Sequence, residues 1–147
     1  MAVPVQTHRL DPAVPLPAYQ TAGAAGFDLA ASADMTVAPG EVTLVPTGLV
    51  MAVPAGHFLA VFARSSTPLK RGLMVANGVG VVDSDYCGPA DEIKLLLWNT
   101  GDAPVDIQQG ERLAQGVFLP FLRAEFEETR LDGPNRGGFG TTGGYHS

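Results

Sequence analysis

The residues best suited to chemistry in this sequence are its few cations, because their scarcity makes their positions informative. The chain has 147 residues and only nine lysines and arginines. Arg64, Lys70 and Arg71 lie close together, and Arg136 stands in a glycine-rich segment near the C-terminus. A guanidinium makes bidentate hydrogen bonds to phosphate oxygens. This local grouping is therefore compatible with a small phosphorylated ligand.

Two carboxylates are the candidates for a general base, which deprotonates a water molecule as the water attacks. Asp83 and Asp85 are two residues apart, and side chains at that spacing point to the same face of a strand. The residues alone therefore do not choose between them. Asp28 taken by itself resembles an ordinary turn or strand-edge aspartate. His8, His57 and His146 lack metal-ligand spacing, and we predict no metal site at any of them.

Composition excludes several classes of partner and compartment. The formal net charge is −6, which is unfavourable for binding long nucleic acid through general electrostatics. Cys87 is the only cysteine, so no intramolecular disulfide can form, as is usual in a reducing compartment. No apolar run approaches the roughly 20 residues of a membrane span, and the N-terminus lacks a signal pattern. We expect a cytoplasmic protein with no membrane or nucleic-acid partner.

Short apolar runs bounded by glycine and proline recur along the chain and are typical of strands joined by turns. The 18 glycines and 12 prolines supply the turns. One or two helical turns fit only around residues 65–71, and only if Pro68 occupies the first turn. We predict one all-β domain over residues 1–132, a barrel or jelly-roll-like sandwich. Its clearest strands are at 41–45, 57–62, 93–98 and 116–119.

The C-terminal segment, residues 133–147, differs in kind from this domain. It is rich in glycine and has almost nothing to bury, so it cannot fold alone. Its composition by itself favours a frayed tail. The alternative is a flexible arm that orders over an anionic ligand, with one arginine, two hydroxyls, one aromatic ring and glycine N–H groups that can approach phosphate.

Five short segments, taken together, resemble the trimeric dUTP diphosphatase (dUTPase) family. Each is weak alone, but all five stand in the family's order across nearly the whole chain. They are AGFDL at 25–29, ARSS at 63–66, GVVDSDYCG at 80–88, RLAQ at 112–115 and RGGFGTTG at 136–143.

The resemblance implies a distorted jelly-roll-like barrel, a homotrimer with active sites at subunit interfaces, and Mg²⁺ as cofactor. The implied reaction cleaves dUTP to dUMP and pyrophosphate by attack of an activated water on the α-phosphate. Such an activity limits uracil incorporation into DNA and supplies dUMP for dTMP synthesis.

The resemblance also assigns roles to individual residues. It makes Asp83, rather than Asp85, the general base, and it makes Asp28 hold Mg²⁺ through water. The segment 77–86, which we expect to be a hairpin, would read uracil and exclude ribose. The implied substrate contacts are Arg64, Ser65, Ser66 and Gln115 for phosphate; Asn77, Val81, Val82 and Tyr86 for the nucleoside; and Arg136, Phe139, Thr141 and Thr142 of the arm.

The sequence departs from the family's commonest pattern at a few places. Ala63 and Ser66 stand where Pro and Gly are common, and Thr141 stands where Ser is usual. Residues 89–92 lengthen the segment after Gly88, and we expect a bulge or an extended turn to absorb them. Lys94, a further implied substrate contact, is the residue whose position depends most on this insertion.

Two other classes of protein are alternatives to a dUTPase. A dCTP deaminase resembles dUTPases in fold and shares the Arg-Ser-Ser motif, but it uses a glutamate where this chain has Leu96. A non-catalytic trimeric binding module would keep the fold without the activity. Intact Asp83, Arg64, Gln115 and Arg136 favour the enzyme over that module.

Overall fold

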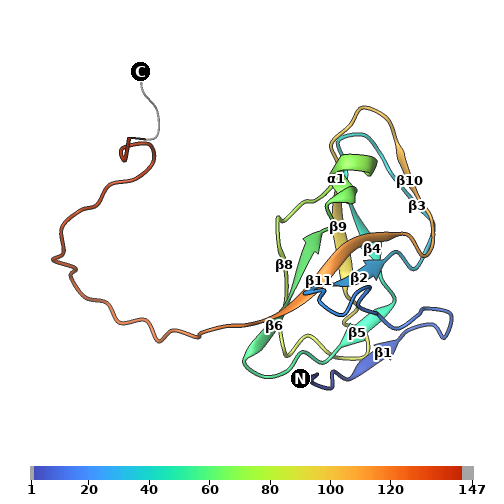
Figure 1. The fold of residues 1–147 in the computed structure, drawn as a ribbon, viewed down its shortest axis with the longest axis horizontal. Coiled ribbons are helices and arrows are strands. Elements are labelled where there is room, and N and C mark those ends of the chain that lie inside the picture. Colours follow the sequence, from blue (N-terminus) through green and yellow to red (C-terminus); the bar gives the residue numbers. More distant parts are fainter. Residues whose placement is uncertain (1, 144–147) are drawn as a thin grey trace.

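The structure, a computed structural model, describes residues 2–143. It is an all-β body with one short helix, and a long extended segment leaves the body at its C-terminal end (Figure 1). The all-β prediction is confirmed. The elements in chain order are β1 (Thr7–Arg9), β2 (Phe27–Ala30), β3 (Met35–Val37), β4 (Val42–Pro46), β5 (Leu49–Met51), β6 (His57–Ala63), α1 (Ser66–Arg71), β7 (Leu73–Val75), β8 (Gly80–Val82), β9 (Lys94–Asn99), β10 (Val105–Ile107) and β11 (Arg112–Pro120).

Two larger sheets and two small ones form the body, and all their pairings are antiparallel. The four-stranded sheet has the order β2-β11-β6-β8, and the three-stranded sheet has the order β4-β9-β7. Strands β1 and β5 form one two-stranded sheet, and β10 and β3 form the other. Strand β6 is therefore an inner strand, hydrogen-bonded to β11 along one edge and to β8 along the other.

The elements predicted from the sequence are present, with shifted ends. The four predicted strands fall on β4, β6, β9 and β11, and β11 begins at Arg112 rather than at Gly116. The helix lies where one or two turns were expected. Pro68 is in its first turn, and Gly72 ends it with a φ of 62°, a conformation that favours glycine.

The prediction of a hairpin at 77–86 is wrong. Strand β8 pairs with β6, which precedes it by almost twenty residues, and not with a neighbouring strand in the sequence. A turn at Gly78, whose φ is +73°, carries the chain from β7 in one sheet to β8 in the other. Asp83 and Asp85 lie in the turn after β8, closed by the bond from Tyr86 N to Asp83 O. The expectation that Asp83 and Asp85 point to the same face of a strand therefore does not apply.

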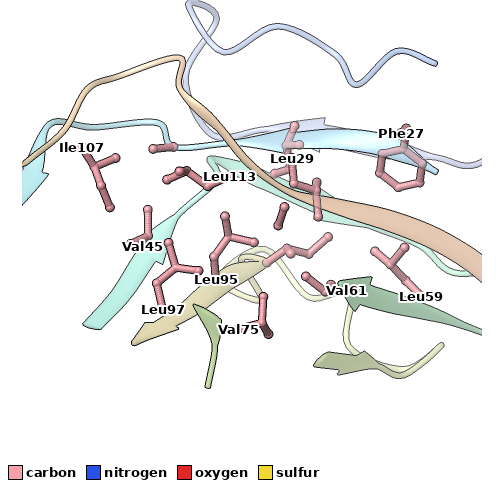
Figure 2. Close-up of a cluster of buried hydrophobic side chains, with 14 of the residues drawn as sticks. Phe27, Leu29, Val45, Leu59, Val61, Val75, Leu95, Leu97, Ile107 and Leu113 are labelled. Atoms are coloured by element: carbon pink, nitrogen blue, oxygen red, sulfur yellow. The ribbon is translucent and has the colours of Figure 1, made fainter. Parts of the chain in front are cut away.

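The core lies between the two larger sheets and is built from their inward-facing side chains (Figure 2). Strand β9 shows the period of two: Leu95 and Leu97 are buried, whereas Lys94 and Trp98 are exposed. The labelled core residues of Figure 2 are Phe27, Leu29, Val45, Leu59, Val61, Val75, Leu95, Leu97, Ile107 and Leu113.

The chain leaves the body after β11 ends at Pro120. Phe121 still donates its N–H to Gly56 O and its ring lies near Phe58. Residues 122–143 are almost all exposed and run away from the sheets (Figure 1). The predicted division between residues 132 and 133, and the flexibility of the arm, stay predictions. Among residues 2–143, no helix combines the length and apolar character of a membrane span.

Gly116 is the position where the core tolerates a side chain least. A Cβ there would lie 2.6 Å from Phe27 Cζ and 2.9 Å from Leu59 Cδ1. Because buried groups would have to shift, we expect Gly116→Ala to lower the free energy of unfolding by about 1–3 kcal/mol. Chemical denaturation at one fixed protein concentration measures this. The control is Gly23→Ala, where a Cβ meets nothing within 4 Å; equal stability of the two variants would contradict the packing argument.

Candidate active site

A cluster of cations lies where β2, β11 and the end of β6 meet. Arg64, directly after β6, places Nε 3.0 Å from Asp28 Oδ1, and Arg112 places Nη1 3.1 Å from Asp28 Oδ2. Arg64 Nη1 also donates to Arg112 O at 3.1 Å. Two guanidiniums around one carboxylate leave an excess positive charge, which suits an anion. We call Arg64, Arg112, Asp28 and Gln115 the cation cluster.

Strand register brings Gln115 into this cluster. Gln115 of β11 lies opposite Asp28 of β2, and directly opposite residues on paired strands share one face. Gln115 Nε2 donates to Ala63 O at 3.1 Å, the carbonyl just before Arg64. A Cβ on residue 26 would lie 2.7 Å from Gln115 Oε1, so Gly26 leaves the space that this amide occupies.

Helix α1 is fastened to the strand that carries Arg112 and Gln115. Thr67 is buried and its Oγ1 donates to Leu113 O at 2.8 Å. Arg71 Nε lies 2.6 Å from Glu111 Oε1, although the N–H does not point along this contact, so the attraction is that of an ion pair. These contacts fix the turn that holds Arg64, Ser65 and Ser66 against β11. Ser65, at the helix start, makes no side-chain capping bond within the described chain.

A cavity of about 400 Å³ lies between β8 and the β4-β9-β7 sheet. Its size falls within the usual range for small-molecule sites. Asp83 lines it, and Asp85 does not. The cavity thus distinguishes the two carboxylates, whereas the residue types and spacing in the sequence did not. Its lining includes six residues predicted from the sequence, Asn77, Val81, Val82, Asp83, Tyr86 and Lys94, together with Glu92 and Leu96.

The inserted residues 89–92 form the extended turn that was expected. Asp91 N donates to Gly88 O at 3.0 Å, and Gly88 N donates back to Asp91 Oδ2 at 2.8 Å. The insertion ends at Glu92, and β9 then starts at Lys94, which is exposed at the cavity. Lys94 therefore keeps a position beside the nucleoside-sized cavity despite the longer turn.

Within one chain the cavity carboxylate and the cation cluster are far apart. Val82 lies opposite Leu59 on β6, so Asp83 is level with Phe58. Arg64 follows the other end of β6, six residues further along. At about 3.3 Å per strand residue, this places the two about 20 Å apart. One chain thus brings Asp28, Arg64 and Gln115 together, and separately Asp83 with the cavity residues, but not both groups.

The predicted arm residues form a third, separate group. Arg136, Phe139, Thr141 and Thr142 are exposed. They belong to the segment after β11, which runs away from the body (Figure 1). A local turn links them, because Thr141 N donates to Gly138 O and Gly138 N donates to Thr141 Oγ1. Phe139 has a φ of 52°, unusual for a residue with a side chain. The last four residues of the arm, one of which is His146, lie outside the described chain.

Asp28 is the one residue predicted to hold a metal ion. No group of three or more His, Cys, Asp or Glu able to hold a metal occurs among residues 2–143. Asp28 Oδ2 accepts a hydrogen bond from Arg112 and Oδ1 forms an ion pair with Arg64, but each carboxylate oxygen can accept two hydrogen bonds. The donor set therefore fits an ion held through water, with the remaining ligands supplied by a phosphorylated ligand.

Three residues of these clusters were given no role from the sequence. Arg112 stands inside the RLAQ segment, so its motif was found without its ion pair to Asp28. Thr67 follows the Arg-Ser-Ser segment and carried no signal of its contact with Leu113. Glu92 belongs to the insertion, for which the sequence predicted an extended turn but no place in the cavity lining.

The fold and these clusters define an all-β protein with a cation cluster and a nucleoside-sized cavity. The family model of dUTPase matches residues 13–143. The chain is 49% identical over 141 residues to the deoxyuridine 5'-triphosphate nucleotidohydrolase of Desulfitobacterium hafniense, covering 92% of this chain and 91% of that protein. This chain belongs to the dUTPase family, as the five segments implied.

Solved structures agree with this assignment. The crystal structure of the dUTPase from Streptococcus mutans is 38% identical, with a TM-score of 0.76, covering 83% of this chain and 98% of that chain. The Staphylococcus bacteriophage 80alpha dUTPase with dUPNHPP matches at a TM-score of 0.86 over 97% of this chain and 99% of that chain. Its sequence identity is 20%, so this second match shows the fold alone.

The contact of Thr67 with Leu113 can be tested by removing only the hydroxyl. We expect Thr67→Val to cost about 1–3 kcal/mol of unfolding free energy, because a buried carbonyl loses its donor. Amide hydrogen exchange in residues 64–71 should become faster. Thr67→Ser keeps the hydroxyl and should retain slow exchange there; equally fast exchange in both variants would mean that the hydrogen bond does not hold the turn.

Proposed function

We propose that this protein hydrolyses dUTP to dUMP and pyrophosphate. The observation that carries the proposal is the cavity that Asp83 lines beside an unpaired strand edge, in a chain of the dUTPase family. The relatives at 42–49% identity named deoxyuridine 5'-triphosphate nucleotidohydrolase support the same substrate. The activity would limit uracil incorporation into DNA and supply dUMP for dTMP synthesis.

Asp83 is the proposed general base. Its carboxylate accepts a proton from a water molecule as that water attacks the α-phosphorus in line with the bond to the leaving pyrophosphate. A base supplies only part of the acceleration, about 10²–10⁴-fold. The remainder comes from holding the phosphates in line and from stabilising the charge that builds up on them.

Strand β8 is the proposed reader of uracil. It is an edge strand of its sheet, so its backbone N–H and C=O groups on one side have no strand partner. Backbone groups at Val81 and Val82, with the amide of Asn77, can match O4, N3–H and O2 of uracil. Cytosine would leave such groups unpaired, and the methyl group of thymine would clash. Tyr86 would lie under the deoxyribose, where a 2′-hydroxyl does not fit.

The cation cluster is the proposed phosphate site. Arg64 with Ser65, Ser66 and Gln115 would bind the phosphate oxygens, and Lys94 would add a positive charge beside the cavity. Asp28 would hold Mg²⁺ through water, as its donor set allows. A bound Mg²⁺ neutralises charge on the triphosphate. Arg112 shares Asp28 with Arg64 and so keeps the carboxylate in place when Arg64 turns to the substrate.

A homotrimer is the proposed working form. The distance of about 20 Å between Asp83 and Arg64 along β6 supports it, because the two could act on one triphosphate only if another copy brought its cation cluster to the cavity. The arm would then close over the site, with Phe139 on the uracil ring and Arg136, Thr141 and Thr142 at the terminal phosphates. We place this activity in the cytoplasm, given the single cysteine, Cys87.

The first test is product formation. With Mg²⁺, the protein should release pyrophosphate from dUTP but not from dCTP, dTTP or UTP, and ammonia should not form. Asp83→Asn should lower kcat by about 10²–10⁴-fold while dUTP still binds. Asp85→Asn is the matched control, since Asp85 lies outside the cavity lining. Ammonia from dCTP, no product at all, or normal turnover by Asp83→Asn would contradict the proposal.

The second test asks whether the site is shared between copies. Asp83→Asn and Arg64→Ala should each be inactive alone. After joint unfolding and refolding at equal amounts, random cyclic trimers should recover about a quarter of the unsubstituted activity, because one site in four combines an intact Asp83 with an intact Arg64. A site built within one chain would recover none, and sedimentation in parallel reports the oligomeric state.

A further inference from the structure

Tyr86 is held by two hydrogen bonds, one from its backbone and one from the tip of its side chain. Its backbone N–H donates to Asp83 O at 3.2 Å, which closes the turn after β8. Its Oη donates to Glu92 O at 2.8 Å. The ring lines the cavity between these two anchors. A ring that is held only by its backbone can change rotamer, whereas one that is also held at its tip cannot move without breaking a hydrogen bond.

The Glu92 side chain is in turn bound to the backbone of the turn that follows β4. Its Oε2 accepts the N–H of Gly48 at 2.8 Å, in the turn between β4 and β5. Gly48 has a φ of +70°, and a Cβ there would lie 2.7 Å from Val14 Cγ2, so this turn is packed closely against Val14. A hydrogen bond to a charged carboxylate is also among the stronger ones in proteins.

The next residue repeats the attachment through its backbone. Ile93 is buried, its N–H donates to Leu49 O at 2.8 Å, and its carbonyl accepts from Thr47 Oγ1 at 2.6 Å. Glu92 and Ile93 are therefore both hydrogen-bonded to residues 47–49. The turn at 88–91, closed by Asp91, spans the distance from Tyr86 to this anchor. The inserted residues thus connect the cavity wall to the core.

We propose that Glu92 is a positioning residue for Tyr86 and thereby sets the discrimination against ribonucleotides. The proposal rests on the function proposed above. The carboxylate of Glu92, bound to Gly48, holds its own backbone carbonyl where it receives the Tyr86 hydroxyl. The ring then forms a rigid wall under the sugar. A 2′-hydroxyl would clash with the Tyr86 ring, and the ring could not move aside because the insertion holds it. The steric exclusion of ribose is therefore stronger than it would be with a mobile ring.

The expected signature is a gain rather than a loss. Glu92→Ala removes the side-chain bond to Gly48 and leaves only the Ile93 backbone bonds to hold the anchor. We therefore expect kcat/KM for UTP to rise and the dUTP-to-UTP ratio to fall about tenfold, the effect of one lost hydrogen bond. The value for dUTP itself should change little. General damage to the fold would lower both substrates together, so this pattern separates positioning from structure.

Conservative variants sharpen the test. Tyr86→Phe keeps the ring but loses the Oη bond, and it should lower the ratio as Glu92→Ala does. The double variant should be no worse than either single one, because both remove the same link. Glu92→Gln keeps an oxygen acceptor for Gly48 N and should restore the ratio. Glu41→Ala, at an exposed glutamate outside the cavity lining, is the matched control.

The outcomes are distinct for the two proposals. An unchanged ratio in both Glu92→Ala and Tyr86→Phe, or additive effects in the double variant, overturns the positioning role. Absence of dUTP hydrolysis by the unsubstituted protein overturns the proposed function instead. If Glu92→Ala does not fold, Tyr86→Phe alone decides, since it removes a single hydroxyl from an exposed ring.

Discussion

Strand β6 is hydrogen-bonded along both of its edges, to β11 on one side and to β8 on the other. The two antiparallel registers decide which residues of the molecule can meet. The β11 register brings Gln115 to the end of β6, beside Arg64, and β2 adds Asp28 from the next position in the sheet. The β8 register sends Asp83 to the other end of β6. The sheet therefore places the cation cluster and the cavity that Asp83 lines at opposite ends of β6.

The sequence was informative wherever a pattern was local. Short apolar runs bounded by glycine and proline located β4, β6 and β9, and the requirement of Pro68 for a first turn located α1. The resemblance to dUTPases favoured Asp83 over Asp85 as the general base; that role stays a prediction, although Asp83 lines the cavity and Asp85 does not. The strands and the helix were predicted correctly because each prediction depends on neighbouring residues. None of them requires knowing which distant strands pair.

The failures were equally physical. The hairpin at 77–86 was wrong because turn residues around Gly78 show that the chain bends but not which strand it then joins, and β8 joins the distant β6. The bond of Thr67 to Leu113 and the ion pair of Arg112 with Asp28 span long stretches of chain and leave no periodic trace. Glu92 sits in an insertion, where a motif comparison has nothing to match.

The brevity of β8 has a consequence for the survival of the folded protein. An open strand edge is a template on which another chain can add its own strand, and such growth leads to aggregation. Here the edge strand has only three residues, Gly80–Val82, bounded by the turn at Gly78 and the turn at Asp83. An edge this short has enough donors and acceptors to bind a small planar molecule. It offers too few backbone hydrogen bonds for another polypeptide to add a stable strand. The peptide groups that we propose read uracil are thus also the ones whose small number limits the addition of a foreign strand.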